Sequence, residues 1–208
     1  GSMDEGQYAV YDDEPTNANI YGNLYNWAVI GDIRGVCPIG WHVPSDDEYT
    51  VLTDFLGGES VAGGKMKEAG LEHWNYYSDQ ISLEATNESG FTGLPAGHRN
   101  TNTGDYIYMS FYGYFWSSTE TSSDLAWRRY LFDYSSGVGQ DTFGKPNGFS
   151  IRCVMDDYTL GDYEIEGRWH LVGYEDNVMY QFVDNYRYSI YSTDGNFGGL
   201  EDAGGSPN

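Results

Sequence analysis

Four histidines are the side chains of this sequence best suited to bind a metal ion or move a proton at neutral pH, and they occupy positions 42, 73, 98 and 170. None is spaced from another as the ligands of a metal motif are, and no HExxH segment occurs. Gly63-Gly64-Lys65 is not a phosphate-binding loop, because Glu59 and Met66 stand where that motif needs Gly and Ser or Thr. A GxSxG segment, which would position a serine nucleophile, is also missing.

Carboxylates are the remaining candidates for catalysis, since a pair of them can hydrolyse a glycosidic bond. Glu88, in a turn with Gly90, and Glu120, after Ser117-Ser118-Thr119, are the most suggestive. The alternative interpretation is that both satisfy backbone amides in turns, and we adopt it. No catalytic residue and no cofactor are therefore expected, although oxygen-rich loops could hold a structural calcium ion.

The excess of acidic residues limits the partners of the protein. Asp and Glu number 32 against 10 Lys and Arg, which gives a net charge of -22. Such a chain repels phosphate backbones, so nucleic acid is not expected as a partner, and an anionic membrane surface is disfavoured. No apolar run is long enough to span a bilayer, so membrane insertion is not expected either. Solubility is the simpler interpretation of the charge, and collection of divalent cations is the alternative.

Aromatic residues are the most conspicuous candidates for binding, with 20 Tyr, 9 Phe and 6 Trp in the chain. In residues 106–143, positions that we assign to the scaffold of the fold alternate with positions that have no such role. Most of the latter are Tyr, Phe, Arg or Asp, which make rigid contacts or oriented hydrogen bonds at low entropic cost. The predicted ligand-binding residues are Tyr106, Tyr108, Phe111, Tyr112, Arg128, Tyr130, Asp133, Tyr134, Asp141 and Phe143. The alternative is that they pack against the aromatic residues of the C-terminal tail.

One helix is clearly predicted among the elements that position these residues. Ser45 and Glu48 form a capping box, and Gly57-Gly58 supplies a left-handed stop. Tyr49, Leu52, Phe55 and Leu56 are expected to share the buried face. A second short helix is expected around residues 64–69. From residue 71 to 154, short aromatic stretches alternate with Gly, Ser, Asn and Thr, which predicts short strands joined by long loops.

The chain divides into three predicted segments. Residues 1–18 are an acidic leader, and Gly1-Ser2 before Met3 looks like a cloning scar. Residues 19–156 form the main α+β domain. Residues 161–208 form a small β meander with strands at 169–174, 178–183 and 186–191 and turns at 184–185 and 193–195. Cys37 and Cys153 are too far apart for a CxxC motif, so they form either a long-range disulfide or two buried thiols.

Six ordered segments carry a resemblance to a known family: residues 21–27 (YGNLYNW), 37–45 (CPIGWHVPS), 62–67 (AGGKMK), 87–91 (NESGF), 113–120 (GYFWSSTE) and 148–154 (GFSIRCV). In this order they resemble the Fibrobacter succinogenes major paralogous domain (FISUMP), over about residues 19–156. The resemblance implies a C-type-lectin-like fold, also related to formylglycine-generating enzymes, in bacterial proteins that are secreted or on the cell surface. It implies one or two helices with short, loop-rich antiparallel strands, and buried tryptophans at 27, 41, 116 and 127.

The resemblance also bears on the cysteines and on function. It implies a Cys37–Cys153 disulfide, which leaves no reactive cysteine pair for formylglycine-generating activity. The calcium-dependent sugar motifs of C-type lectins do not occur. The expected function is an extracellular ligand-binding module that presents an aromatic loop face to a protein or glycan without catalysis. The alternatives are a structural or adhesive module of a larger assembly, and a carboxylate-dependent glycan-active enzyme. Residues 167–174 loosely resemble the first strand of a lipocalin-like barrel. On this interpretation the tail is the beginning of such a barrel, cut short.

Overall fold

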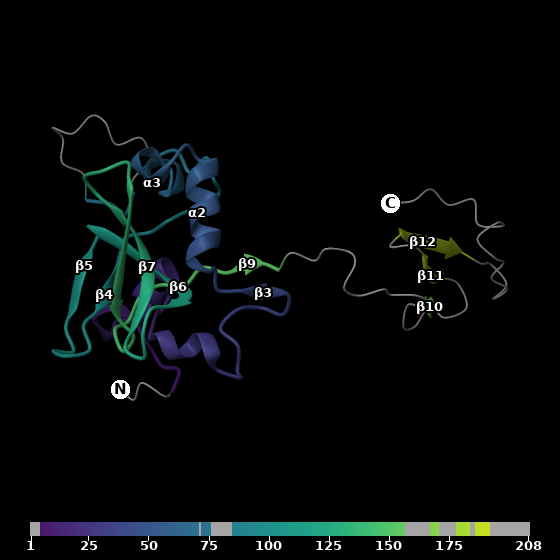
Figure 1. The fold of residues 1–208 in the computed structure, drawn as a ribbon, viewed down its shortest axis with the longest axis horizontal. Helices are drawn as coiled ribbons and strands as arrows, with labels where there is room; N and C mark the ends of the chain where they lie inside the picture. Colours follow the sequence, from purple (N-terminus) through teal and green to yellow (C-terminus); the bar gives the residue numbers. More distant parts are fainter. Residues whose placement is uncertain are drawn as a thin grey trace. The chain divides into compact units, whose positions relative to one another are not determined.

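The computed structural model describes residues 5–70, 72–75 and 85–156, together with the backbone of three strands in the C-terminal tail. The chain separates into two compact units, Gly1–Asp156 and Asp157–Asn208. Figure 1 shows the helices and most of the strands in the first unit, and each unit is described here by itself. Within the described ranges, every helix is too short or too polar to cross a membrane.

The first unit is an α+β domain built around one five-stranded sheet with the strand order β5-β4-β6-β7-β8. Only β4 and β6 pair in parallel, and the other neighbours are antiparallel. Two short ladders, β1-β2 and β3-β9, lie outside this sheet. In chain order the elements are β1 Tyr8–Ala9, η1 Tyr11–Asp13, α1 Pro15–Tyr21, β2 Leu24–Tyr25, η2 Trp27–Gly31, β3 Trp41–His42, α2 Asp46–Phe55, α3 Glu59–Met66, β4 Ala96–Arg99, β5 Tyr106–Met109, β6 Tyr112–Glu120, β7 Leu125–Phe132, β8 Val138–Gly144 and β9 Val154–Met155.

Helix α2 begins where the capping box predicts. The Ser45 hydroxyl accepts a hydrogen bond from the Glu48 amide at 3.2 Å, and the Glu48 carboxylate accepts one from the Ser45 amide at 2.8 Å. The helix ends before Gly57, whose φ of 105° is a conformation that favours glycine. The following helix, α3, starts at Glu59, earlier than the predicted 64–69.

The buried face of α2 differs from the predicted one at a single residue. Tyr49 and Leu56 are buried and Leu52 packs against them, but the Phe55 side chain is 85% exposed. At 100° per residue, Thr53 lies on the buried side of the helix and Phe55 lies beyond its edge. The prediction that Phe55 faces the sheet is therefore wrong, and Thr53 takes its place.

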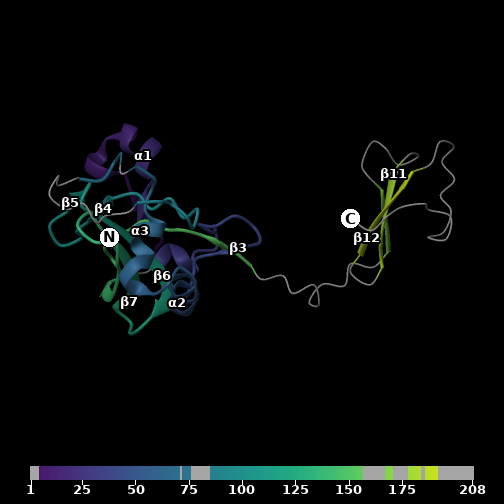
Figure 2. The same cartoon turned by 90° about the horizontal axis from the view of Figure 1, so that it is seen from above.

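Alternation along β6 and β7 gives the sheet two different faces. Phe115 and Leu131 point toward α2 and α3 and join Tyr49 and Leu56 in the main core. Their neighbours in sequence therefore point to the other face, where aromatic residues gather. Figures 1 and 2 show α2 and α3 close to these strands.

A buried arginine fixes the helices to the sheet. Arg129 in β7 is almost inaccessible, and its Nε donates to the Asp46 carboxylate at 3.0 Å. Its two Nη atoms reach the Glu59 carboxylate at 3.3 Å and the Thr50 hydroxyl at 2.8 Å. One guanidinium thus connects both helices to β7 through several hydrogen bonds, which is how a buried charge is made tolerable.

The four tryptophans of the predicted framework are buried to different degrees. Trp116 is fully buried and donates to the Tyr25 carbonyl at 2.8 Å. Trp27 and Trp127 are half-buried. Trp41 is 44% exposed, contrary to the prediction, because it lies in the two-residue ladder β3-β9 opposite the exposed Met155.

The second unit contains a three-stranded antiparallel meander of β10 (Gly167–His170), β11 (Val178–Val183) and β12 (Tyr186–Tyr191). The last two strands coincide with the predicted ranges, and the described part of the first is shifted toward the N-terminus. The predicted turns at 184–185 and 193–195, and the aromatic side chains of the tail, lie outside the described residues.

Candidate functional site

An aromatic surface lies on the side of the sheet opposite to α2 and α3. Tyr112 in β6 is its centre, with ring centroids 5.2 Å from Tyr108, 5.8 Å from Phe132 and 6.3 Å from Tyr134. Tyr112 also stacks on Tyr114 at 5.4 Å with the rings nearly parallel. We call this surface the aromatic face and define it as Tyr108, Tyr112, Tyr114, Arg128, Tyr130, Phe132, Tyr134, Asp141 and Phe143.

The aromatic face is covered at one end and open at the other. At the covered end, Tyr114 and Phe143 pack against the buried ring of Phe149, with Trp27 nearby in the same cluster. At the open end, Tyr108 and Tyr134 are 51% and 49% exposed. Except for Tyr134, which lies in the turn after β7, this surface is carried on strands, whereas the sequence predicted a face built from loops.

Hydroxyl groups give the open end a polar component. The Tyr112 and Tyr134 oxygens lie 3.4 Å apart, and this hydrogen bond, with burial, raises the pKa of Tyr112 to about 12. Burial is the main cause of the raised pKa of Tyr130. The hydroxyls of Tyr112 and Tyr130 are therefore neutral at physiological pH and can both donate and accept hydrogen bonds.

Arg128 is the buried cation of the aromatic face and packs against its rings. Its guanidinium carbon lies 4.0 Å from the Phe143 ring centre and 4.4 Å from that of Tyr114, in cation–π contact. Its Nε and Nη2 donate to the two oxygens of Asp141 at 2.7 and 3.1 Å. Arg128 is buried, so we infer that it orients the rings, while the partly exposed Asp141 is the charged group that a ligand can reach.

His98 in β4 completes the base of the surface. It is buried among the rings of Tyr108, Tyr114 and Phe149. Burial and the neighbouring Arg128 charge lower the pKa of His98 to about 4. The imidazole is therefore neutral at physiological pH, which lets it pack beside a guanidinium.

Three of the predicted binding residues lie away from the aromatic face. The Tyr106 ring packs on Tyr11, and its hydroxyl donates to Asp13 at 2.6 Å. Asp133 is buried, with the Asn75 amide 3.5 Å away. Phe111 is exposed in the turn between β5 and β6, and among the described residues no ring contact joins it to the others.

The comparison with known families identifies the first unit. The family model of the Fibrobacter succinogenes major domain matches residues 2–155. The chain belongs to this family. Neither a curated protein nor a solved structure matched it.

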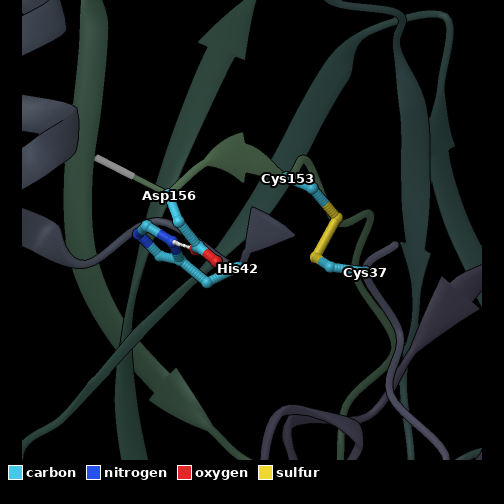
Figure 3. Close-up of a disulfide and its surroundings, with 4 residues drawn as sticks. All are labelled: Cys37, His42, Cys153 and Asp156. Carbon is cyan, nitrogen blue, oxygen red and sulfur yellow. Dashed lines mark hydrogen bonds and ion pairs between the residues drawn. A yellow bond between two sulfur atoms is a disulfide. The ribbon is translucent and has the colours of Figure 1, made fainter. Parts of the chain in front are cut away.

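The Cys37–Cys153 disulfide expected for the Fibrobacter major domain is present, with the two Cα atoms 5.8 Å apart. Figure 3 shows it beside His42 and Asp156. The His42 Nδ1 lies 2.6 Å from an Asp156 oxygen, and its Nε2 lies 2.7 Å from an oxygen of Glu48. Hydrogen bonding to Asp156, and also to Glu48, raises the pKa of His42 despite its partial burial. The disulfide and this histidine therefore join the segment before α2 to the end of the domain.

The sequence interpretation missed four residues of this region in the Fibrobacter major domain: His98, Tyr114, Phe132 and Phe149. Two of them carried a usable signal. Phe132 follows Arg128 and Tyr130 at the spacing of one strand face, and Tyr114 follows Tyr112 in the same way. Nothing local indicated that His98 and Phe149 would pack under these rings.

Other side chains in the domain are of types that act in catalysis or bind metals, but their surroundings are ordinary. Glu88 and Glu120, considered above for glycoside hydrolysis, form ion pairs with Lys65 at 3.6 Å and with Lys145 at 2.5 Å. Glu68, Glu72 and His73 have ligand atoms within 4.8 Å of one another, a donor set closer to that of a transition metal than of calcium. His73 already hydrogen-bonds Glu68 at 2.8 Å, so these two side chains have a partner in each other without a metal ion.

Proposed function

We propose that this protein is a secreted or cell-surface binding module without catalytic activity, and that the open end of the aromatic face contacts a protein or glycan ligand. The observation that carries the proposal is the contiguous set of partly exposed rings around Tyr112, on strands β5, β6 and β7 and in the turn that follows β7. Exposed contiguous apolar surface with polar hydroxyls is typical of interaction sites.

The physical properties of this surface favour recognition over catalysis. Tyrosine provides a large contact area with few rotatable bonds, so its ordering on binding costs little entropy. Arg128 and Asp141 neutralise one another, which leaves the surface without a strong field of its own. A neutral aromatic surface within an acidic protein suits a ligand that is not a polyanion.

The proposed location and fold rest on separate supports. A disulfide persists in oxidising environments, which supports a secreted or cell-surface setting. A C-type-lectin-like fold is proposed from the family, and the disulfide between the segment before α2 and the end of the domain supports it.

A structural or adhesive role is the second candidate, and one observation favours it. Ile33 and Ile39 lie on either side of Cys37 in the sequence and are fully exposed, and Trp41 and Met155, paired across β3 and β9, are partly exposed. An apolar surface of this kind suits docking to a neighbouring segment of a larger assembly. Self-association that is lost on changing Ile33 and Ile39 to Ser, measured by analytical ultracentrifugation, would favour this role.

The binding proposal is tested with the two most exposed rings of the face. The variant combines Tyr108→Asn with Tyr134→Ala, since Asn tolerates the positive φ of 68° at position 108. Protein and glycan arrays identify a ligand of the native protein, and the variant should bind it at least about tenfold more weakly. The matched control combines Tyr8→Ala with Phe55→Ala, two exposed rings outside the face.

The melting temperatures of both variants should stay close to that of the native protein. Equal loss of binding in the control, or full binding by the Tyr108/Tyr134 variant, would show that the ligand does not use this face.

A further inference from the structure

A concave region lies apart from the aromatic face, and its lining includes strand β1. It is a hollow of about 300 Å³ bounded by segments that are distant in sequence. Its polar lining comes from Gln7, Asp13, Asn26, Arg99, Thr101 and Tyr106. Small-molecule sites are typically concave regions of at least this size where a few polar groups converge.

Arg99 is the unusual residue of this hollow. Its Nε is buried and, among the described residues, has no hydrogen-bond partner. Of the other described arginines, three pair with carboxylates (Arg34, Arg128 and Arg129), and Arg152 donates to backbone carbonyls instead. No carboxylate of the described residues lies within ion-pair distance of Arg99, although the protein carries 32 acidic residues. Arg99 interacts with the ring and hydroxyl of Tyr106, so a neutral group and no described carboxylate faces its charge directly.

Tyr106 contacts both Arg99 and a hydrogen-bond acceptor, Asp13. The Arg99 guanidinium lies 5.7 Å from the Tyr106 ring centre, and the Tyr106 hydroxyl donates to Asp13 at 2.6 Å. The Asp13 oxygen bound by Tyr106 leaves the second carboxylate oxygen able to accept a further hydrogen bond. The lining of the hollow therefore includes a cation, Arg99, and an acceptor, Asp13, with Tyr106 in contact with both.

We propose that this hollow binds a small organic acid, with its carboxylate paired to Arg99 and a hydroxyl donating to Asp13. The planar guanidinium matches a carboxylate through two parallel hydrogen bonds. A volume of about 300 Å³ admits a hydroxy acid or a single acidic sugar. The net charge of -22 acts against long polyanions, and the hollow has a single arginine, so an acid with one negative charge suits it best.

The test is a titration followed by amide chemical shifts at about 0.15 M salt, where charges beyond about 8 Å are screened but the local pair is not. The probes are D-glycerate and D-glucuronate, and their neutral counterparts are glycerol and D-glucose. At least one acid should shift the amides of residues 99–106 and bind at least about tenfold more tightly than its neutral counterpart. Which acid binds more tightly distinguishes a free hydroxy acid from a sugar acid.

Arg99→Gln should weaken binding of that acid at least about tenfold, and Arg99→Lys, which keeps the charge, should retain part of it. The matched control is Arg34→Gln, an exposed arginine outside the hollow, which should bind as the native protein does. Melting temperatures establish that each variant is folded. Equal binding of acid and neutral probe, no binding of either acid, or undiminished binding by folded Arg99→Gln would overturn the proposal. None of these outcomes bears on the aromatic face, which lies elsewhere.

Discussion

His42 is held by two carboxylates that come from different parts of the domain, Glu48 in α2 and Asp156 after β9. Their hydrogen bonds raise the pKa of His42 above the value of about 6.5 expected in an unfolded chain. The folded state therefore binds the proton more tightly than the unfolded state. The resulting stabilisation is fully present below about pH 6.5 and is lost as pH rises through the folded pKa.

We expect His42→Asn to lower the melting temperature more at pH 5.5 than at pH 8.5. Thermal unfolding of the native protein and the variant at both pH values measures the difference. Asp156→Asn should likewise lower the melting temperature more at pH 5.5 than at pH 8.5, since the hydrogen bond to Asp156 is the largest cause of the raised pKa of His42. All three groups are partly exposed, so the effect should shrink in high salt. A melting-temperature difference that is independent of pH would mean that His42 does not titrate with folding.

Leu56 and Phe55 are adjacent in sequence but differ in burial, so they test the assignment of the α2 face. Leu56→Ala should lower the free energy of unfolding by about 2–5 kcal/mol, because the side chain is buried in the main core. Phe55→Ala should change it by less than about 0.5 kcal/mol, because the ring is exposed. Urea denaturation measures both. Comparable losses for the two variants would indicate that α2 is rotated about its axis.

At the scale of elements, α3 packs against the loop before β8 through backbone contact. A Cβ atom added at Gly63 would lie 2.0 Å from the Gly137 carbonyl oxygen, and the Gly64 amide donates to the Ser136 carbonyl at 2.9 Å. No side chain fits between these two segments, so glycine at position 63 sets how closely α3 approaches the sheet.

Gly63→Ala should therefore destabilise the domain by about 1–3 kcal/mol, since backbone must move to admit one methyl group. Gly31→Ala is the matched control, because a Cβ there would meet no atom within 4 Å. The control should leave stability unchanged or raise it by up to about 1 kcal/mol. Chemical denaturation measures the free energy of unfolding of both variants. A Gly63→Ala protein as stable as the control would contradict this close packing of α3.

At the scale of the whole molecule, the disulfide closes the larger part of the first unit, from Cys37 to Cys153, into one covalent loop. Cys37 and Cys153 are 116 residues apart, and cross-links of that span stabilise the folded state by up to about 4–5 kcal/mol on the chain-entropy argument.

Reduction should lower the urea midpoint of the native protein. A Cys37→Ser/Cys153→Ser variant should already have the lower midpoint and should not respond to reductant. Identical midpoints with and without reductant would mean that the cross-link does not contribute to stability.

Local signals in the sequence determined several features correctly. The capping box of Ser45 and Glu48 and the glycines at 57 and 58 set the bounds of α2, because capping depends only on residues within one turn. Six ordered motifs identified the family and, through it, the disulfide.

Tertiary structure decided which aromatic residues share a surface. The sequence grouped Tyr106 with Tyr108, but the positive φ of Tyr108 breaks the alternation of β5, so the two rings join different clusters. The exposure of Trp41 and the burial of Asp133 likewise depend on segments distant in sequence. Periodicity fixes the direction of a side chain within its own element, whereas burial is set by whatever the rest of the chain places over it.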